Sequence, residues 1–282
     1  MNVVQRDPAL HDRLAALARE VRIAIVAGLP GTGKSLLIHQ LAHLAAAAGR
    51  SVSLLQWDVV RPVFEATAAG RRHPVVDGVT QPIIRRAVGV WARRAIAEWA
   101  GRCATPSHVL IGEAPLVGGR LAELIHPRDD EAEPVLAGPA CRFVLPVPSV
   151  AVRRHVEHER ARRTVDARHP REREDAPPQV LRGLWRELLD VARTLGVGDA
   201  ADTYDPAVYR HVYERVLRHR RLDVVSIDAV LPTSAMSVYD FAVPHQDLVP
   251  DDADADRLVR EVEIRHPDPA ALAREVGAWW TA

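Results

Sequence analysis

The sequence predicts an α/β fold, a three-layer sandwich in which a parallel sheet of about five strands lies between helices. Short apolar runs rich in β-branched residues alternate with segments that have the 3.6-residue periodicity of amphipathic helices. A glycine-rich turn separates the first such run from the next helix. Of the 282 residues, 48% are hydrophobic and 26% charged, which suffices to bury one large core. We therefore expect a single domain over residues 1–282.

The expected elements follow one another in a regular order along the chain. Asp7 and Pro8 have the residue types of a helix N-cap and a first helical position, and so they predict an N-terminal helix. Strands alternating with helices imply a parallel sheet that is covered on both faces. Strands are expected at residues 22–27, 52–57, 108–111, 141–146 and 224–227, and helices at about 34–48, 83–99, 206–218, 253–264 and 269–280.

Two stretches depart from this rhythm. Residues 150–178 are strongly charged, and we expect them to form an arginine-rich lid inserted into the domain. A strongly amphipathic helix is expected to begin near Pro178. Residues 230–282 are expected to form a helical extension that packs on the same domain. No repeat and no glycine/serine linker indicates a second independent domain.

Charge and cysteine content argue against several classes of function. The 37 basic and 37 acidic residues cancel, so no overall field attracts nucleic acid or anionic lipid, and a nucleic-acid partner would need a local patch. Cys103 and Cys141 are not at metal-ligand spacing. Charged side chains within residues 1–20 exclude a signal-peptide core, and no apolar run reaches bilayer-spanning length. We expect a cytoplasmic protein without a membrane partner.

The glycine-rich turn, Gly28-Leu29-Pro30-Gly31-Thr32-Gly33-Lys34-Ser35, matches the Walker A pattern G-x-x-x-x-G-K-[ST] between a predicted strand and a predicted helix. Lys34 is the only lysine of the chain. The backbone N–H groups of such a loop and the dipole of the following helix hold phosphates, Lys34 would contact the β/γ-phosphates, and the Ser35 hydroxyl would ligate Mg²⁺. The predicted binding residues for ATP, or another purine triphosphate, are Gly28, Pro30, Gly31, Thr32, Gly33, Lys34 and Ser35.

The single lysine also excludes some nucleotide-binding classes. The guanine motif N-K-x-D of GTPases and the strand motif V-A-I-K of protein kinases each require a lysine outside the loop. AAA-type motors usually close the third strand with adjacent Asp and Glu, whereas this strand ends in Gly112-Glu113. A ring motor is therefore disfavoured.

Four charged residues are candidates for the carboxyl edge of the sheet, beside the phosphates. Asp58 and Arg61 follow the second strand about one helical turn apart, although a surface ion pair is the alternative. Glu113 ends the third strand and could hold magnesium through water or contact an acceptor. Arg120 could reach the same cleft, and a purely structural role for Glu113 is about equally favoured.

The order of these motifs resembles the polynucleotide-kinase branch of the P-loop kinases, with zeta toxins and small-molecule kinases as relatives. The resemblance rests on the glycine-rich loop, the D-x-x-R of Asp58 and Arg61, and the carboxylate of Glu113, and it extends over residues 21–190. It implies that Asp58 is the general base for an acceptor hydroxyl and that Arg61 steadies the phosphoryl group or the acceptor. The C-terminal third has no counterpart in this resemblance.

The expected lid supplies five arginines that could close over the γ-phosphate, as arginine fingers do. Arg160 and Arg163, one helical turn apart, are the favoured catalytic candidates. Interleaved acidic residues support the alternative of a solvated charged helix. The five arginines are Arg153, Arg154, Arg160, Arg162 and Arg163.

The sequence thus leaves two hypotheses for function. The first is an ATP- and Mg²⁺-dependent phosphotransferase that moves the γ-phosphate to a hydroxyl of a polynucleotide 5′-end, a nucleoside or another small molecule. The second is an ATP-hydrolysing switch that acts on a protein partner. Aromatic residues of the C-terminal third could form its partner surface, although burial in the core is the more common place for them. These residues are Tyr239, Phe241, Trp279 and Trp280.

Overall fold

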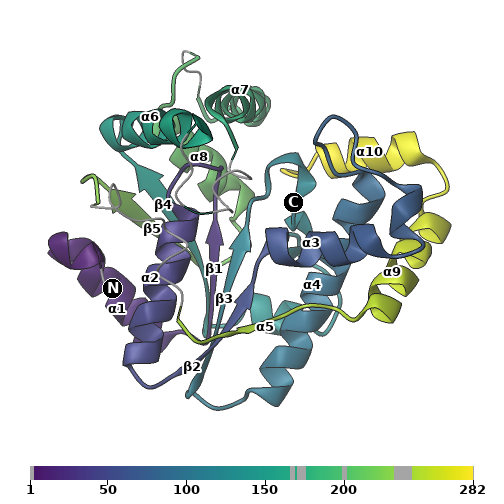
Figure 1. Ribbon diagram of the computed structural model, residues 1–282, viewed down its shortest axis with the longest axis horizontal. Coiled ribbons are helices and arrows are strands. Elements are labelled where there is room, and N and C mark those ends of the chain that lie inside the picture. The colour runs from purple at the N-terminus through teal and green to yellow at the C-terminus, as the bar shows by residue number, and fades with distance from the viewer. Residues whose placement is uncertain (1–2, 166–168, 170–175, 199–201, 232–242, 282) are drawn as a thin grey trace.

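The computed structural model describes residues 3–165, 169, 176–198, 202–231 and 243–281. At its centre lies a six-stranded sheet with the order β5-β4-β1-β3-β2-β6, in which every neighbouring pair is parallel (Figure 1). The fold is therefore α/β with a parallel sheet between helices, as expected. The strands are β1 (Ile23–Ala27), β2 (Ser51–Leu55), β3 (His108–Ala114), β4 (Cys141–Pro148), β5 (Leu222–Ile227) and β6 (Gln246–Asp247).

Helices cover both faces of the sheet because side chains alternate along each strand. On β1, Ile23 and Ile25 point into the larger core, and Ala24 and Val26 point into the smaller one. Helices α1 (Pro8–Glu20) and α2 (Lys34–Ala47) pack on the smaller core. The larger core is covered by α3 (Trp57–Ala66), α4 (Pro82–Arg102), α7 (Pro178–Leu195) and α8 (Pro206–Val216).

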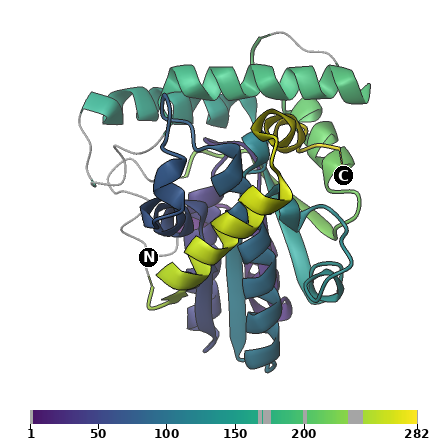
Figure 2. The same ribbon diagram turned by 90° about the vertical axis from the view of Figure 1, so that its right-hand side faces the viewer.

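The C-terminal helices belong to the same core. Helix α9 (Asp252–Arg265) crosses α4, as Figure 2 shows, and α10 (Pro269–Gly277) packs against α4 and the loop after β3. Leu258, Val262 and Trp279 are buried in the larger core together with the sheet. Helices α9 and α10 therefore form a layer outside α4, and residues 232–242 of the expected extension lie outside the described residues.

The five expected strands are all present. The structure differs from the expectation at the end of the second strand and in having a sixth strand beside it. Strand β2 ends at Leu55, and helix α3 begins at Trp57, where the strand was expected to continue. A tertiary contact explains the earlier turn, since the backbone N–H of Trp57 donates to the buried Glu113 carboxylate. The sixth strand, β6, was not expected, because its two residues only extend the edge of the sheet beside β2 and carry no periodic signal.

The segment expected as a lid contains helix α6 (Val150–Val165), which directly follows β4 and packs against α7. Most of the remainder, residues 166–168 and 170–175, lies outside the described residues. The described residues also contain five shorter helices. They are η1 (Val3–Arg6), η2 (Gly70–Arg72), η3 (Val117–Gly119), η4 (Ala122–Leu124) and α5 (Glu133–Leu136). Within the described part of the chain, no helix is both long and apolar enough to cross a bilayer.

Candidate functional site

The candidate site lies at the carboxyl edge of the sheet, where the two central strands end side by side. Ala27 of β1 pairs with Ala114 of β3, so the segments that follow these strands start at the same edge. Ligands of open α/β sheets bind outside this edge. The segments that meet there are the glycine-rich loop (residues 28–35), the start of α3, the loop of residues 115–121, and the start of α6.

The glycine-rich loop has a backbone that its glycines permit. Gly28, Gly31 and Gly33 have φ values of 135°, 78° and 92°, in the region that disfavours side chains. The Thr32 hydroxyl donates to the carbonyl oxygen of Leu29 at 2.8 Å and closes the turn. Gly33 provides no side-chain cap for α2, whose N-terminal N–H groups and dipole favour an anion at this position.

Lys34 is buried in the loop, with 8% of its surface exposed, and its Nζ donates to the Leu29 carbonyl at 3.1 Å. Burial lowers the pKa of the ammonium group to about 8, against the opposing effect of the Glu113 carboxylate. Asp58 also favours the charged form, while Arg120 and Arg160 disfavour it. Four charged groups, two acidic and two basic, therefore act electrostatically on the amine of Lys34.

Glu113 joins two elements of the site. Its Oε1 accepts a hydrogen bond of 3.2 Å from the backbone N–H of Trp57, the first residue of α3. This satisfies one of the N–H groups that a helix start leaves unpaired. Burial raises the pKa of Glu113, and the nearby charges of Lys34 and Asp58 act in opposite directions on it. Asp58 itself is exposed in the first turn of α3.

The two arginines considered at this edge have different surroundings. Arg61 makes an ion pair of 2.8 Å with Glu65 along α3. Arg120 is half-buried, and its charge is felt by both Lys34 and Glu113. Of the two, Arg120 is therefore the one that lies among the charged groups around Lys34. The sequence signal for Arg120 was its place after two glycines that follow the third strand.

Among the lid arginines, Arg153 contacts the glycine-rich loop. It is 2% exposed, and its Nη1 donates to the Pro30 carbonyl at 2.7 Å. Arg160, a favoured candidate, donates to the Ala176 carbonyl at 2.9 Å and acts on the pKa of Lys34. Arg163 is in α6, but its side chain lies outside the described residues. Sequence reasoning gave Arg153 no preference, although it lies in the first turn after β4.

Two tyrosines of α8 also reach this edge, where the sequence predicted only a helix. Tyr209 and Tyr213 are fully buried, and their rings lie 4.9 Å apart. The Tyr209 hydroxyl lies so close to Gly28 that a Cβ at this glycine would collide with it. Burial raises the pKa of both phenols, so they remain neutral hydrogen-bond donors at neutral pH. Their four-residue spacing is the same as that of ordinary core positions on a helix.

The donor set at the site fits magnesium better than a metal held by the protein alone. Within the described residues, no group of three or more His, Cys, Asp or Glu side chains could hold a metal ion. Magnesium, however, usually keeps several waters and takes one or two protein oxygens together with substrate phosphates. The half-buried Ser35 hydroxyl in the first turn of α2 and the Glu113 carboxylate are oxygens of this kind.

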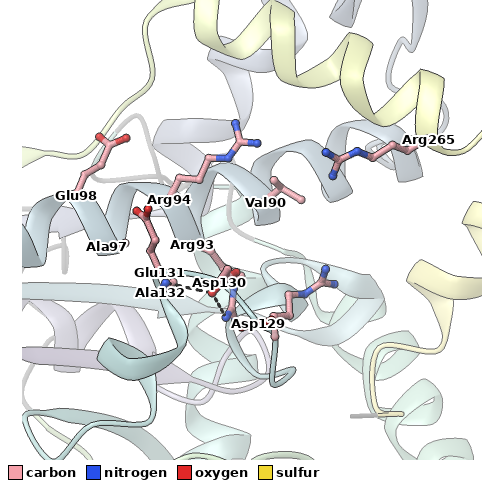
Figure 3. A pocket seen from close by; sticks show the side chains of 11 residues that line it. Val90, Arg93, Arg94, Ala97, Glu98, Asp129, Asp130, Glu131, Ala132 and Arg265 are labelled. Atoms are coloured by element: carbon pink, nitrogen blue, oxygen red, sulfur yellow. Dashed lines mark hydrogen bonds and ion pairs between the residues drawn. The ribbon is translucent and has the colours of Figure 1, made fainter.

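A hollow of about 710 Å³ lies away from the candidate site, between the middle of α4, the segment before α5 and the end of α9 (Figure 3). Four arginines and four acidic residues line it, so their formal charges cancel. Arg93 at its floor is held by Asp130 at 2.6 Å and Glu133 at 2.9 Å, which is a structural arrangement. No residue of the glycine-rich loop, α3 or the 115–121 loop contributes to this hollow.

The fold and the edge cluster define a class by architecture: an α/β protein with an all-parallel sheet and a glycine-rich loop between β1 and α2. No protein-family model, no curated protein and no solved structure matches the chain. What the site does is therefore argued from its residues alone.

Proposed function

We propose that the chain is an ATP- and Mg²⁺-dependent P-loop phosphotransferase that moves the γ-phosphate to a hydroxyl acceptor. One observation carries the proposal: the buried Lys34 begins α2 directly after the glycine-rich loop, at the same edge of the sheet where Glu113 lies near the end of β3 and Asp58 lies in the first turn of α3. Phosphoryl transfer needs positioned positive charge and a base near the attacking oxygen, and it needs little else. This edge of the sheet supplies both.

In the proposed reaction, the N–H groups at the start of α2 and the Lys34 ammonium hold the β- and γ-phosphates. The Asp58 carboxylate accepts the proton of the acceptor hydroxyl as its oxygen forms a bond to the γ-phosphorus. The bond between the γ-phosphorus and the β–γ bridging oxygen breaks, and ADP leaves with the electron pair. Bound magnesium would neutralise phosphate charge, with Ser35 and Glu113 as its protein-side oxygens.

The lid arginines would complete the site over the transferred group. Arg153 is held against the glycine-rich loop by its hydrogen bond to Pro30. Arg160 is close enough to Lys34 to lower the pKa of its amine. We assign Arg153 to positioning the loop, and Arg160 to stabilising charge on the transferred phosphoryl group, as a planar guanidinium can. Arg61, engaged by Glu65, would act only after that ion pair opens.

The test is transfer of labelled γ-phosphate from ATP to a panel of 5′-hydroxyl oligonucleotides, nucleosides, sugars and hydroxy acids, with magnesium present. Lys34→Ala, Asp58→Asn and the wild type are compared, with Arg257→Gln as a surface control on α9. The proposal expects label on one class of acceptor and loss of transfer in both site variants. Asp58→Asn should lower kcat by about 10²–10⁴-fold, as removal of a general base does, while the control leaves the rate unchanged.

An ATP-hydrolysing switch would give a different result: labelled free phosphate only, released at the same rate by wild type and Asp58→Asn. No surface of the described residues favours this alternative. Trp279, one of the aromatics considered for a partner surface, is fully buried in the core, and Trp280 is half-buried beside it. Tyr239 and Phe241 lie outside the described residues.

A further inference from the structure

The loop after β3, which carries Arg120, has an unusual backbone conformation on either side of this residue. Leu116 and Leu121 have φ values of 60° and 59°, in the left-handed region that branched side chains rarely adopt. Both leucines are buried, and Leu116 and Arg120 pair across the loop. Such conformations persist only where the surrounding structure imposes them, and they cluster at ligand-binding positions.

Contacts with α4, α7 and the segment after α10 impose this conformation. Arg85 of α4 donates to the carbonyl oxygen of Gly118, and the N–H of Gly118 donates to Glu187 of α7 at 3.2 Å. The same Glu187 oxygen accepts from the Trp279 indole at 3.3 Å, just beyond α10. The loop therefore cannot shift without breaking contacts to α4, α7 and the C-terminal segment.

The backbone of this loop is held in place, but the Arg120 guanidinium has few partners of its own. Within the described residues its one hydrogen bond runs from Nε to the Val117 carbonyl at 3.0 Å, and it makes no ion pair there within 4.0 Å. Two of the three acidic groups near it are engaged elsewhere: Glu113 accepts from Trp57, and Glu187 accepts from Gly118 and Trp279. The third, Asp58, makes no ion pair with Arg120 within 4.0 Å in the described part of the chain. The outer nitrogens of a half-buried arginine fork are thus left available.

A second donor without a partner lies beside it. The Tyr213 side chain is fully buried, yet in the described part of the chain its hydroxyl has no hydrogen-bond partner. Tyr213 and Asp58 both lie close enough to Arg120 to act on its guanidinium electrostatically. Buried polar groups are nearly always paired, so an unpaired buried hydroxyl within electrostatic range of an arginine whose outer nitrogens have no partner points to a missing ligand group.

We infer that Arg120 and Tyr213 bind an anionic group, a carboxylate or a phosphate, carried by the hydroxyl acceptor. An arginine fork matches the two oxygens of such a group, and a phenol adds a third donor. With its anion on Arg120, the acceptor would present a hydroxyl to Asp58, the neighbour that Arg120 and Lys34 share. This inference rests on the proposed phosphotransferase function and names the acceptor as a hydroxy acid or a phosphorylated alcohol.

Binding and transfer test the inference separately. Protein saturated with magnesium and a non-hydrolysable ATP analogue is titrated calorimetrically with glycerol 3-phosphate, glycerate and glycerol, which share one carbon skeleton. The two anions should bind and glycerol should not, and the tighter of the two identifies phosphate or carboxylate. Arg120→Gln should weaken anion binding by about 10- to 100-fold, the range for a lost charge-assisted hydrogen bond. Tyr213→Phe, which keeps the ring packing, should weaken it by less.

Arg257→Gln on α9 is the matched control, and thermal melts verify that each variant is folded. Equal binding of glycerol, or wild-type anion affinity in Arg120→Gln, overturns the inference. Lys34→Ala serves as a further check, because anion binding that it abolishes would belong to the glycine-rich loop and would also overturn it. If anions bind through Arg120 but no acceptor in the panel receives phosphate, the anion site stands and the phosphotransferase proposal fails.

Discussion

Nη1 of Arg153 donates a hydrogen bond of 2.7 Å to the carbonyl oxygen of Pro30 and thereby ties the first turn of α6 to the glycine-rich loop. The same guanidinium pairs with Glu157 at 2.9 Å and lies over the Tyr204 ring, 5.5 Å from its centre. A methyl group on Gly31 would lie 2.8 Å from Nη1, so arginine and loop are in close contact. The helix that follows β4 therefore helps to set the shape of the loop.

Replacing Arg153 with lysine should weaken nucleotide binding. Lysine keeps the charge but is a single point donor, so it cannot hold Pro30 and Glu157 together as the fork does. We expect the Kd for ATP to rise by about tenfold or more, equivalent to one charge-assisted hydrogen bond. Fluorescent-nucleotide titration measures this, with the exposed neighbour Arg154→Lys as control. Equal affinities of Arg153→Lys and wild type would contradict the positioning role.

The pH dependence of nucleotide binding should follow Lys34. Burial lowers the pKa of its amine from 10.5 to about 8 in the free protein, so the ammonium charge is present below pH 8 and is lost above it. Because the phosphates need the charged form, the Kd for ATP should rise above pH 8, by up to about tenfold per pH unit. Lys34→Arg stays charged in this range. Titrations from pH 6.5 to 9.5 should therefore show a slope for wild type and none for the arginine variant.

Two substitutions of Glu113 should separate its structural role from its proposed role in binding magnesium. Glu113→Gln keeps an oxygen for the Trp57 N–H and removes the charge, so the protein should remain stable but require more magnesium for activity. Glu113→Ala also leaves that N–H buried without a partner, which should lower the free energy of unfolding by about 1–3 kcal/mol. Urea melts and magnesium titrations are the measurements. A similar loss of stability in both variants would show that the charge, not the hydrogen bond, supports α3.

The contact of the C-terminal segment with the 115–121 loop should depend on Gly119. A Cβ at Gly119 would collide with the Val276 side chain and backbone, whereas at Gly118 the nearest atom is the Arg85 Nη1, at 3.4 Å. Both glycines have positive φ, 67° and 74° for Gly118 and Gly119, so both alanine variants carry the same backbone cost. Gly119→Ala should therefore be the less stable of the two and should increase amide hydrogen exchange in α10. Equal effects would mean that α10 does not rely on this close approach.

Acid sensitivity should be governed partly by Glu133, away from the candidate site. Burial alone would raise its pKa, but hydrogen bonds from Arg220 and Arg93 outweigh this and lower the pKa to about 2. The resulting stability, on the order of 2–3 kcal/mol, is present above the ordinary pKa near 4.5 and is lost as pH falls toward 2. The stability difference between wild type and Glu133→Gln should therefore shrink between pH 6 and pH 3. A constant difference in urea melts over this range would refute the assignment.

Local patterns predicted most of the fold, because strand and helix periods are properties of neighbouring residues. The Asp7 cap, the five longer strands and the helices α2, α4, α8, α9 and α10 appear within a few residues of where the sequence placed them, whereas α3 was not expected. Local patterns did not predict the end of β2, because a carboxylate on another strand, Glu113, satisfies the first N–H of α3. They could not predict β6 either, whose pairing depends on where a distant segment returns to the sheet edge.

The sequence by itself determined the glycine-rich loop, since its glycines and Lys34 define a backbone and a charge independently of their surroundings. Only the tertiary structure decided which arginines accompany it. Arg61 pairs with Glu65 on its own helix, Arg153 reaches Pro30 from another element, and the loop that carries Arg120 is held by contacts from α4 and α7. An arginine has the same side chain at every position. The fold alone decides which guanidinium forms an ion pair with a carboxylate on its own helix and which remains available at the edge of the sheet.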